Sequence, residues 1–82
     1  MNIHHFTVAF QKEPDGGYTA IVPALPGCVT WGETVEAAQV AVREAIQSYL
    51  GSLAKDHEET PHDVSFVSSV DVVSSLIPHA YA

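Results

Sequence analysis

Residues 3–11 alternate between large apolar and mainly polar side chains. Three apolar residues fall on one side of an extended chain: Phe6, Val8 and Phe10. This period of two predicts a half-buried strand over residues 3–11. Pro14 and the triplet Asp15-Gly16-Gly17 follow, and these residue types favour the positive φ angles of a hairpin loop. We therefore expect a second strand over residues 18–22 to pair with the first.

Residues 15–34 hold four of the five glycines and two of the five prolines. Pro23 and Pro26 have no backbone N–H, so residues 23–27 are expected to form an irregular corner rather than a strand. A short third strand is expected over residues 28–31. Six residues receive structural roles in the turn, the corner and the helix start: Gly16, Gly17, Pro23, Pro26, Gly27 and Thr34.

A long helix is predicted over residues 35–54, where apolar residues recur at steps of three and four. Thr34 is a suitable N-cap because its hydroxyl can accept a hydrogen bond from the first turn. Glu33 and Glu36 place negative charge at the positive end of the helix dipole. A polar linker follows over residues 55–63, and residues 64–73 again alternate, which predicts a last strand.

This order predicts an α+β fold of the type β-β-β-α-β. We expect one four-stranded mixed sheet of order 3-2-1-4, with the long helix packed on one face, as in part of the ribonuclease H fold. Residues 1–73 would form a single domain, and residues 74–82 a C-terminal tail. The other sheet face has no helix to cover it. We therefore expect self-association, as a homodimer or a higher homo-oligomer, through that face or an edge strand.

The composition changes this picture mainly through charge. Three Lys and Arg residues stand against ten Asp and Glu, a formal net charge of −7. Such an acidic surface repels phosphate backbones, so we expect no direct nucleic-acid binding and find a basic protein partner reasonable. Solubility alone also explains the charge. With no apolar run of membrane-spanning length and no signal peptide, a cytoplasmic protein that does not enter membranes is expected.

Candidate catalytic and metal-binding groups do not form a convincing set. Cys28 starts a strand that we expect to be buried, not a helix N-terminus or a basic site that would lower its pKa, and this favours a core cysteine over a nucleophile. His4 and His5 are adjacent, so on a strand they point to opposite faces. His57 and His62 lie in the polar linker without a rigid ligand spacing. We therefore expect no cofactor and no functional metal.

The expected strand order invites a comparison with two-metal nucleases. Their chemistry needs converging carboxylates on the first strand, the helix and the fourth strand. The helix offers Glu36 or Glu44 and the last strand offers Asp71, but residues 3–11 contain no Asp or Glu. The bridging ligand is missing, and we expect no enzymatic activity.

Residues 15 to about 53 resemble the HicB-like antitoxin family. The resemblance is carried by a proline- and glycine-rich corner followed closely by a Gly-Glu-Thr helix start. The matching segments are Asp15-Gly16-Gly17-Tyr18, Val22-Pro23-Ala24-Leu25-Pro26-Gly27-Cys28, Gly32-Glu33-Thr34, Glu36-Ala37-Ala38, Glu44-Ala45-Ile46 and Tyr49-Leu50.

The resemblance implies a protein that binds and occludes a small basic ribonuclease toxin of the HicA type, in a type II toxin–antitoxin system. Many members also carry a C-terminal DNA-binding module, whereas only nine residues follow Val73 here. We therefore expect the protein-binding part alone. The alternative is a stand-alone, self-associating regulatory or binding module without a toxin.

Four residues are candidate partner contacts. Exposed aromatic side chains often anchor interfaces, which makes Tyr18 and Trp31 candidates, although core packing explains them equally well. Glu33 and Glu36 are suited to meet basic residues of a toxin, although the helix dipole also explains them.

Overall fold

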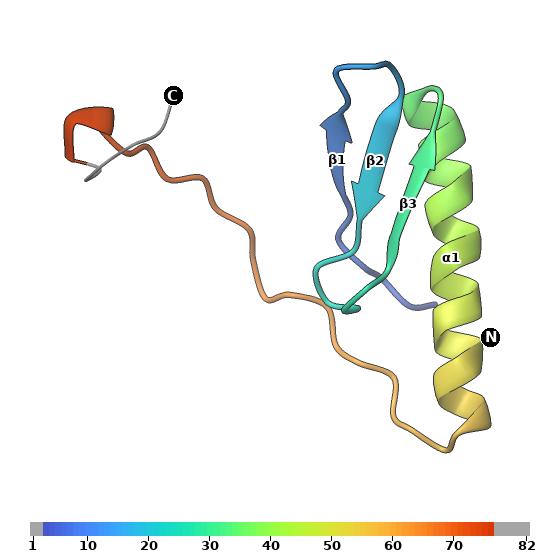
Figure 1. Ribbon diagram of the computed structural model, residues 1–82. Helices are drawn as coiled ribbons and strands as arrows, with labels where there is room; N and C mark the ends of the chain where they lie inside the picture. The colour runs from blue at the N-terminus through green and yellow to red at the C-terminus, as the bar shows by residue number, and fades with distance from the viewer. Residues whose placement is uncertain (1–2, 77–82) are drawn as a thin grey trace.

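The computed structural model describes residues 3–76. It contains three short strands, one long helix and a single 3-10 turn (Figure 1). In chain order these are β1 (Ala9–Lys12), β2 (Tyr18–Ile21), β3 (Val29–Gly32), α1 (Val35–Lys55) and η1 (Ser74–Leu76).

The three strands form an antiparallel sheet of order β1-β2-β3. The hairpin between β1 and β2 is closed by the Glu13 N–H, which donates to the Gly17 carbonyl at 3.0 Å. The strand predicted from residue 3 begins only at Ala9, which pairs with Ile21 at the end of β2. The Val22 N–H still donates across to the Cys28 carbonyl at 3.1 Å, and the pairing ends there because Pro23 has no N–H to offer.

The corner of residues 23–27 is tied by its own backbone. The Leu25 N–H donates to the Val22 carbonyl at 3.1 Å, and the Cys28 N–H donates to the Leu25 carbonyl at 2.9 Å. Gly27 has a φ of 81°, a left-handed conformation that a side chain would disfavour. These bonds turn Leu25 inward until only 1% of its surface is exposed. The corner predicted from the prolines is therefore also part of the core.

Helix α1 begins and ends with side-chain and backbone caps. The Thr34 hydroxyl accepts a hydrogen bond from the Ala37 N–H at 3.0 Å, as predicted. At the other end His57 has a φ of 60°, and the N–H groups of His57 and Glu58 donate to the Ala54 and Leu53 carbonyls. This is a Schellman ending with histidine where glycine is usual. In the part of the chain described, no helix is apolar enough over a membrane-spanning length.

The core lies between α1 and the sheet face that it covers (Figure 1). It is small, and its fully buried members are Ala20, Val22, Leu25, Cys28, Ala38 and Val42. Gly32 lets the helix approach, because a Cβ at this position would overlap the backbone of Ala37 and Ala38. Contact between backbones therefore fixes the start of α1 against β3.

The predicted fourth strand is wrong. In the described residues the sheet has three strands, all antiparallel, so neither the mixed sheet nor the order 3-2-1-4 is present. Residues 64–73 run away from the sheet in an extended path without strand pairing (Figure 1). Alternation indicated an extended segment correctly, but it does not specify a partner strand. Of the expected tail, Ser74–Leu76 forms η1, and the rest lies outside the described residues.

One contact joins the chain after the helix to the chain before the sheet. The Thr7 N–H donates to Asp63 Oδ1 at 2.9 Å, and the Thr7 hydroxyl donates to Asp63 Oδ2 at 2.8 Å. His5 Nε2 lies 3.7 Å from the same Oδ2. The hydrogen bond from the Thr7 amide, above all, holds the pKa of the Asp63 carboxyl below its ordinary value.

We predict that Gly32→Ala destabilises the fold by about 2 kcal/mol or more, because the new methyl group overlaps backbone that cannot rotate away. The control is Gly51→Ala in α1, where a Cβ meets no atom within 4 Å. That change should stabilise the protein by roughly 0.5–1 kcal/mol through helix propensity. Urea denaturation measures both, and equal effects would contradict the close approach.

We predict that the Asp63 carboxylate titrates below the usual aspartate range, that is, below about pH 4. Since its pKa is lower in the folded than in the unfolded state, its stabilising effect is present at neutral pH. It is lost as the pH falls through the folded-state pKa. The Thr7 amide proton shift, followed by NMR from pH 7 downward, should report this titration. Asp63→Asn should abolish it, and a midpoint at or above the ordinary aspartate value would contradict the contact.

Candidate protein interface

The sheet face opposite α1 is mainly apolar, and no element of the described chain covers it. Strand pairing places Ala9, Ile21 and Val29 side by side across the sheet. The next row on this face is Gln11, Thr19 and Trp31. Val29 is 53% exposed and Trp31 is 51% exposed. We call these six residues the open face, and none of them is charged.

Trp31 is held in place on the open face. A Cβ at Gly17 would overlap the indole ring of Trp31, so the ring lies directly over the backbone of the hairpin loop. The ring is therefore oriented by backbone contact while half of its surface meets solvent. A rigid, half-exposed tryptophan is the residue type most often found at the centre of protein interfaces.

The other three predicted contact residues lie elsewhere. Tyr18 pairs with Gly32 on the covered face and packs, half-buried, against the core. Glu33 and Glu36 are exposed at the start of α1. The structure thus puts Tyr18 and Trp31 on opposite sheet faces, and the partner contacts of all four residues stay predictions.

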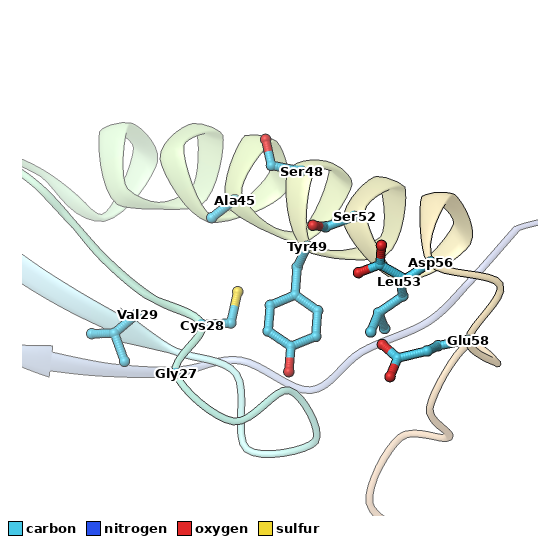
Figure 2. A pocket seen from close by; sticks show the side chains of 10 residues that line it. All are labelled: Gly27, Cys28, Val29, Ala45, Ser48, Tyr49, Ser52, Leu53, Asp56 and Glu58. Atoms are coloured by element: carbon cyan, nitrogen blue, oxygen red, sulfur yellow. The ribbon is translucent and has the colours of Figure 1, made fainter.

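A groove runs between the second half of α1 and the corner (Figure 2). It exists because a helix of 21 residues, about 31 Å long, extends beyond strands of four residues, about 13 Å long. Tyr49 and Leu53 point from α1 toward the corner in Figure 2 and supply much of the apolar wall. The groove has a volume of about 580 Å³ and is lined by Gly27, Cys28, Val29, Ala45, Ser48, Tyr49, Ser52, Leu53, Asp56 and Glu58.

The charge of the groove is one-sided. Asp56 and Glu58 stand at the end where α1 stops, and the lining contains no Lys, Arg or His. The C-terminal end of the helix dipole adds further negative potential there. Burial raises the pKa of the Cys28 thiol, so this residue contributes apolar surface rather than a thiolate. The groove suits a long cationic side chain, whose stem packs on Tyr49 and whose head meets the carboxylates.

The histidine-rich linker does not assemble into a metal site. Across residues 3–76, no three His, Cys, Asp or Glu side chains lie close enough together to hold an ion. Asp63 lies in the same linker as His57 and His62, but its carboxylate accepts hydrogen bonds from Thr7.

Sequence reasoning missed the groove and the Thr7–Asp63 contact. Both join segments far apart in the chain; Thr7 and Asp63 are 56 residues apart. A usable signal for the groove was present, since the apolar stripe of α1 continues to Leu53 while the strands are short. No comparable signal in the sequence marked Asp63.

Comparison with known proteins assigns the chain to a family. A family model described as a HicB-like antitoxin of bacterial toxin–antitoxin systems matches residues 6–75. A UPF0150 protein of Thermoplasma acidophilum is 47% identical over 58 residues, which cover 71% of this chain and 84% of the relative. A UPF0150 protein of Synechocystis is 38% identical over 71 residues, covering 87% and 90% of the two chains.

A third relative, a UPF0150 protein of Helicobacter pylori, is 37% identical over 74 residues, covering 90% of this chain and 94% of its own. The match extends beyond the corner and the helix, which carried the resemblance in the sequence, and includes residues on both sides of them. The chain belongs to the HicB-like antitoxin family.

Proposed function

We propose that this protein is an antitoxin that binds and occludes a small basic ribonuclease toxin of the HicA type. The observation that carries this proposal is the family match over residues 6–75. Occlusion requires a stable surface and no chemistry of the antitoxin's own. We therefore propose a protein without catalytic activity, cofactor or metal, acting in the cytoplasm as part of a type II system.

The charge balance supports a basic partner. A net charge of −7 on 82 residues attracts a basic protein and raises the rate of encounter at low salt. The same charge disfavours direct contact with nucleic acid. The excess of carboxylates therefore fits a role in which the antitoxin competes with RNA for the toxin.

The groove is the surface that best matches such a toxin. It combines an apolar wall, which can bury side chains, with two carboxylates and no cation. Contact with a charged, partly buried groove of this kind gives both affinity and selection for basic partners. Glu33 and Glu36, at the opposite end of α1, form a second acidic patch proposed to meet the toxin.

A stand-alone module is the second candidate function. The open face favours it, because half-exposed Val29 and Trp31 suit self-association without any toxin. The two candidates differ in whether a short basic protein is encoded beside this chain and is bound by it.

We predict that co-expression with the product of an adjacent reading frame for a short basic protein restores growth and yields a co-purifying complex. The physical reason is burial of the toxin surface against the acidic groove. Growth is scored with the neighbour alone, with both proteins, and with an empty vector. If growth is not restored and no complex co-purifies, the antitoxin proposal is rejected and the stand-alone module remains.

We predict that the double change Asp56→Asn and Glu58→Gln slows association with that toxin by about tenfold at low salt and weakens its salt dependence. A carboxylate at a helix C-terminus is unfavourable with the dipole, so Asp56→Asn should not destabilise α1. Stopped-flow mixing measures the rates.

The matched control removes two carboxylates elsewhere, Asp15→Asn in the hairpin loop and Glu44→Gln on α1. Both residues are exposed and outside the groove lining. Equal rates for the two double variants would show that net charge alone attracts the toxin and that the groove is not its site.

A further inference from the structure

Between the polar linker and η1 the chain forms an extended segment, residues 64–73, which we call the arm. Its large apolar side chains contact almost nothing. Phe66 is 82% exposed and Val70 is 81% exposed. The remaining ones, at 63–70% exposure, are Val67, Val72 and Val73. So many exposed apolar groups on a short segment mark an interaction site.

The arm has the composition of a strand but no strand to pair with. Valine dominates it, and it contains neither glycine nor proline. On one side of an extended path lie Val64, Phe66, Val70 and Val72, interrupted by Ser68. The arm's single charged residue, Asp71, falls on the other side. One side of the arm is therefore apolar and uncharged.

The arm leaves the domain at the margin of the open face. Thr7 lies between Phe6 and Val8, which pack against the core, so its side chain belongs to the opposite, open side. Both carboxylate oxygens of Asp63 accept hydrogen bonds from Thr7, which fixes the start of the arm there. From this point the arm runs away from its own sheet (Figure 1).

We propose that the arm of each molecule packs, through its apolar side, against the open face of a second copy. The same chain supplies both surfaces, and neither the six open-face residues nor the apolar side of the arm includes a charged residue. The carboxylate of Glu13 lies at the hairpin end of the open face, where it accepts a hydrogen bond from the Thr19 hydroxyl at 2.7 Å. A two-fold axis makes the exchange reciprocal, so that each copy gives one arm and receives one.

Dimensions agree with exchange between copies. Ten extended residues reach about 33 Å, whereas a three-stranded sheet is only about 10 Å wide between its outer strands. The radius of gyration is 16.1 Å, while a compact chain of this length is expected near 12 Å. The arm is thus long enough to cross a neighbour's sheet.

Trp31 makes this proposal measurable. It is the only tryptophan, and it lies on the open face with half of its surface exposed. Sedimentation velocity and acrylamide quenching of its fluorescence are recorded on the full chain from about 1 µM to about 100 µM. We expect dimers to form with concentration, while the quenching constant of Trp31 falls about twofold in parallel. If the molecule's own arm covered Trp31, the quenching constant would not change with protein concentration.

The test variant is Val70→Asp, which charges the apolar side of the arm. It should stay monomeric, with Trp31 fully accessible at every concentration. The control Ser69→Asp adds the same charge on the other side and should dimerise as the unchanged protein does. Both positions are exposed, so far-ultraviolet circular dichroism should confirm an intact fold for each.

Three results would overturn the proposal. They are a wild-type chain that is monomeric throughout, a dimer in which Trp31 stays as accessible as in the monomer, and a Val70→Asp variant that retains both the dimer and the protection of Trp31. No toxin is present in these measurements, so their outcome is independent of the antitoxin proposal.

Discussion

The close approach of α1 to β3 at Gly32 is the constraint on which the structure depends. A side chain at this position would overlap the helix backbone, so the glycine allows contact that no other residue permits. That contact packs Ala38 and Val42 against the sheet, where they join the other four buried hydrophobic residues of the core. In the described residues one helix packs on one small sheet, so there is a single interface between layers. The described chain leaves the opposite sheet face uncovered.

Two binding surfaces of different character result from this arrangement. The open face is mainly apolar, with no charged residue among its six members, which suits a second copy of the same acidic chain. The groove is apolar with a carboxylate end, because α1 is longer than the strands and Asp56 and Glu58 directly follow its last turn. The two surfaces meet at Val29, which belongs to both. Self-association and toxin binding are therefore proposed for neighbouring surfaces rather than for one shared site.

Local features could be read from the sequence because local chemistry determines them. Thr34 caps α1, glycines turn the hairpin, and the two prolines interrupt the strands where the corner forms. Nothing local distinguished the roles of Tyr18 and Trp31, because the difference depends on which face the helix covers.

Features that depend on a partner segment could not be read in the same way. The alternation over residues 64–73 is real, yet no strand pairs with it in the described chain, and the expected four-stranded sheet is absent. The hydrogen bonds between Thr7 and Asp63 join two polar residues, and nothing in the sequence near either one indicates the other as its partner. The groove arises from a difference in length between helix and strands. Each of these is a relation between segments rather than a property of one.

The most direct test of the central claim is a titration of the toxin's ribonuclease activity with this protein. The substrate would be a single-stranded RNA, and the toxin the short basic product of the adjacent reading frame. Occlusion predicts that activity falls in proportion to added antitoxin and is abolished near stoichiometric amounts, with no cleavage by the antitoxin alone. Unchanged toxin activity in the presence of excess antitoxin would contradict the account.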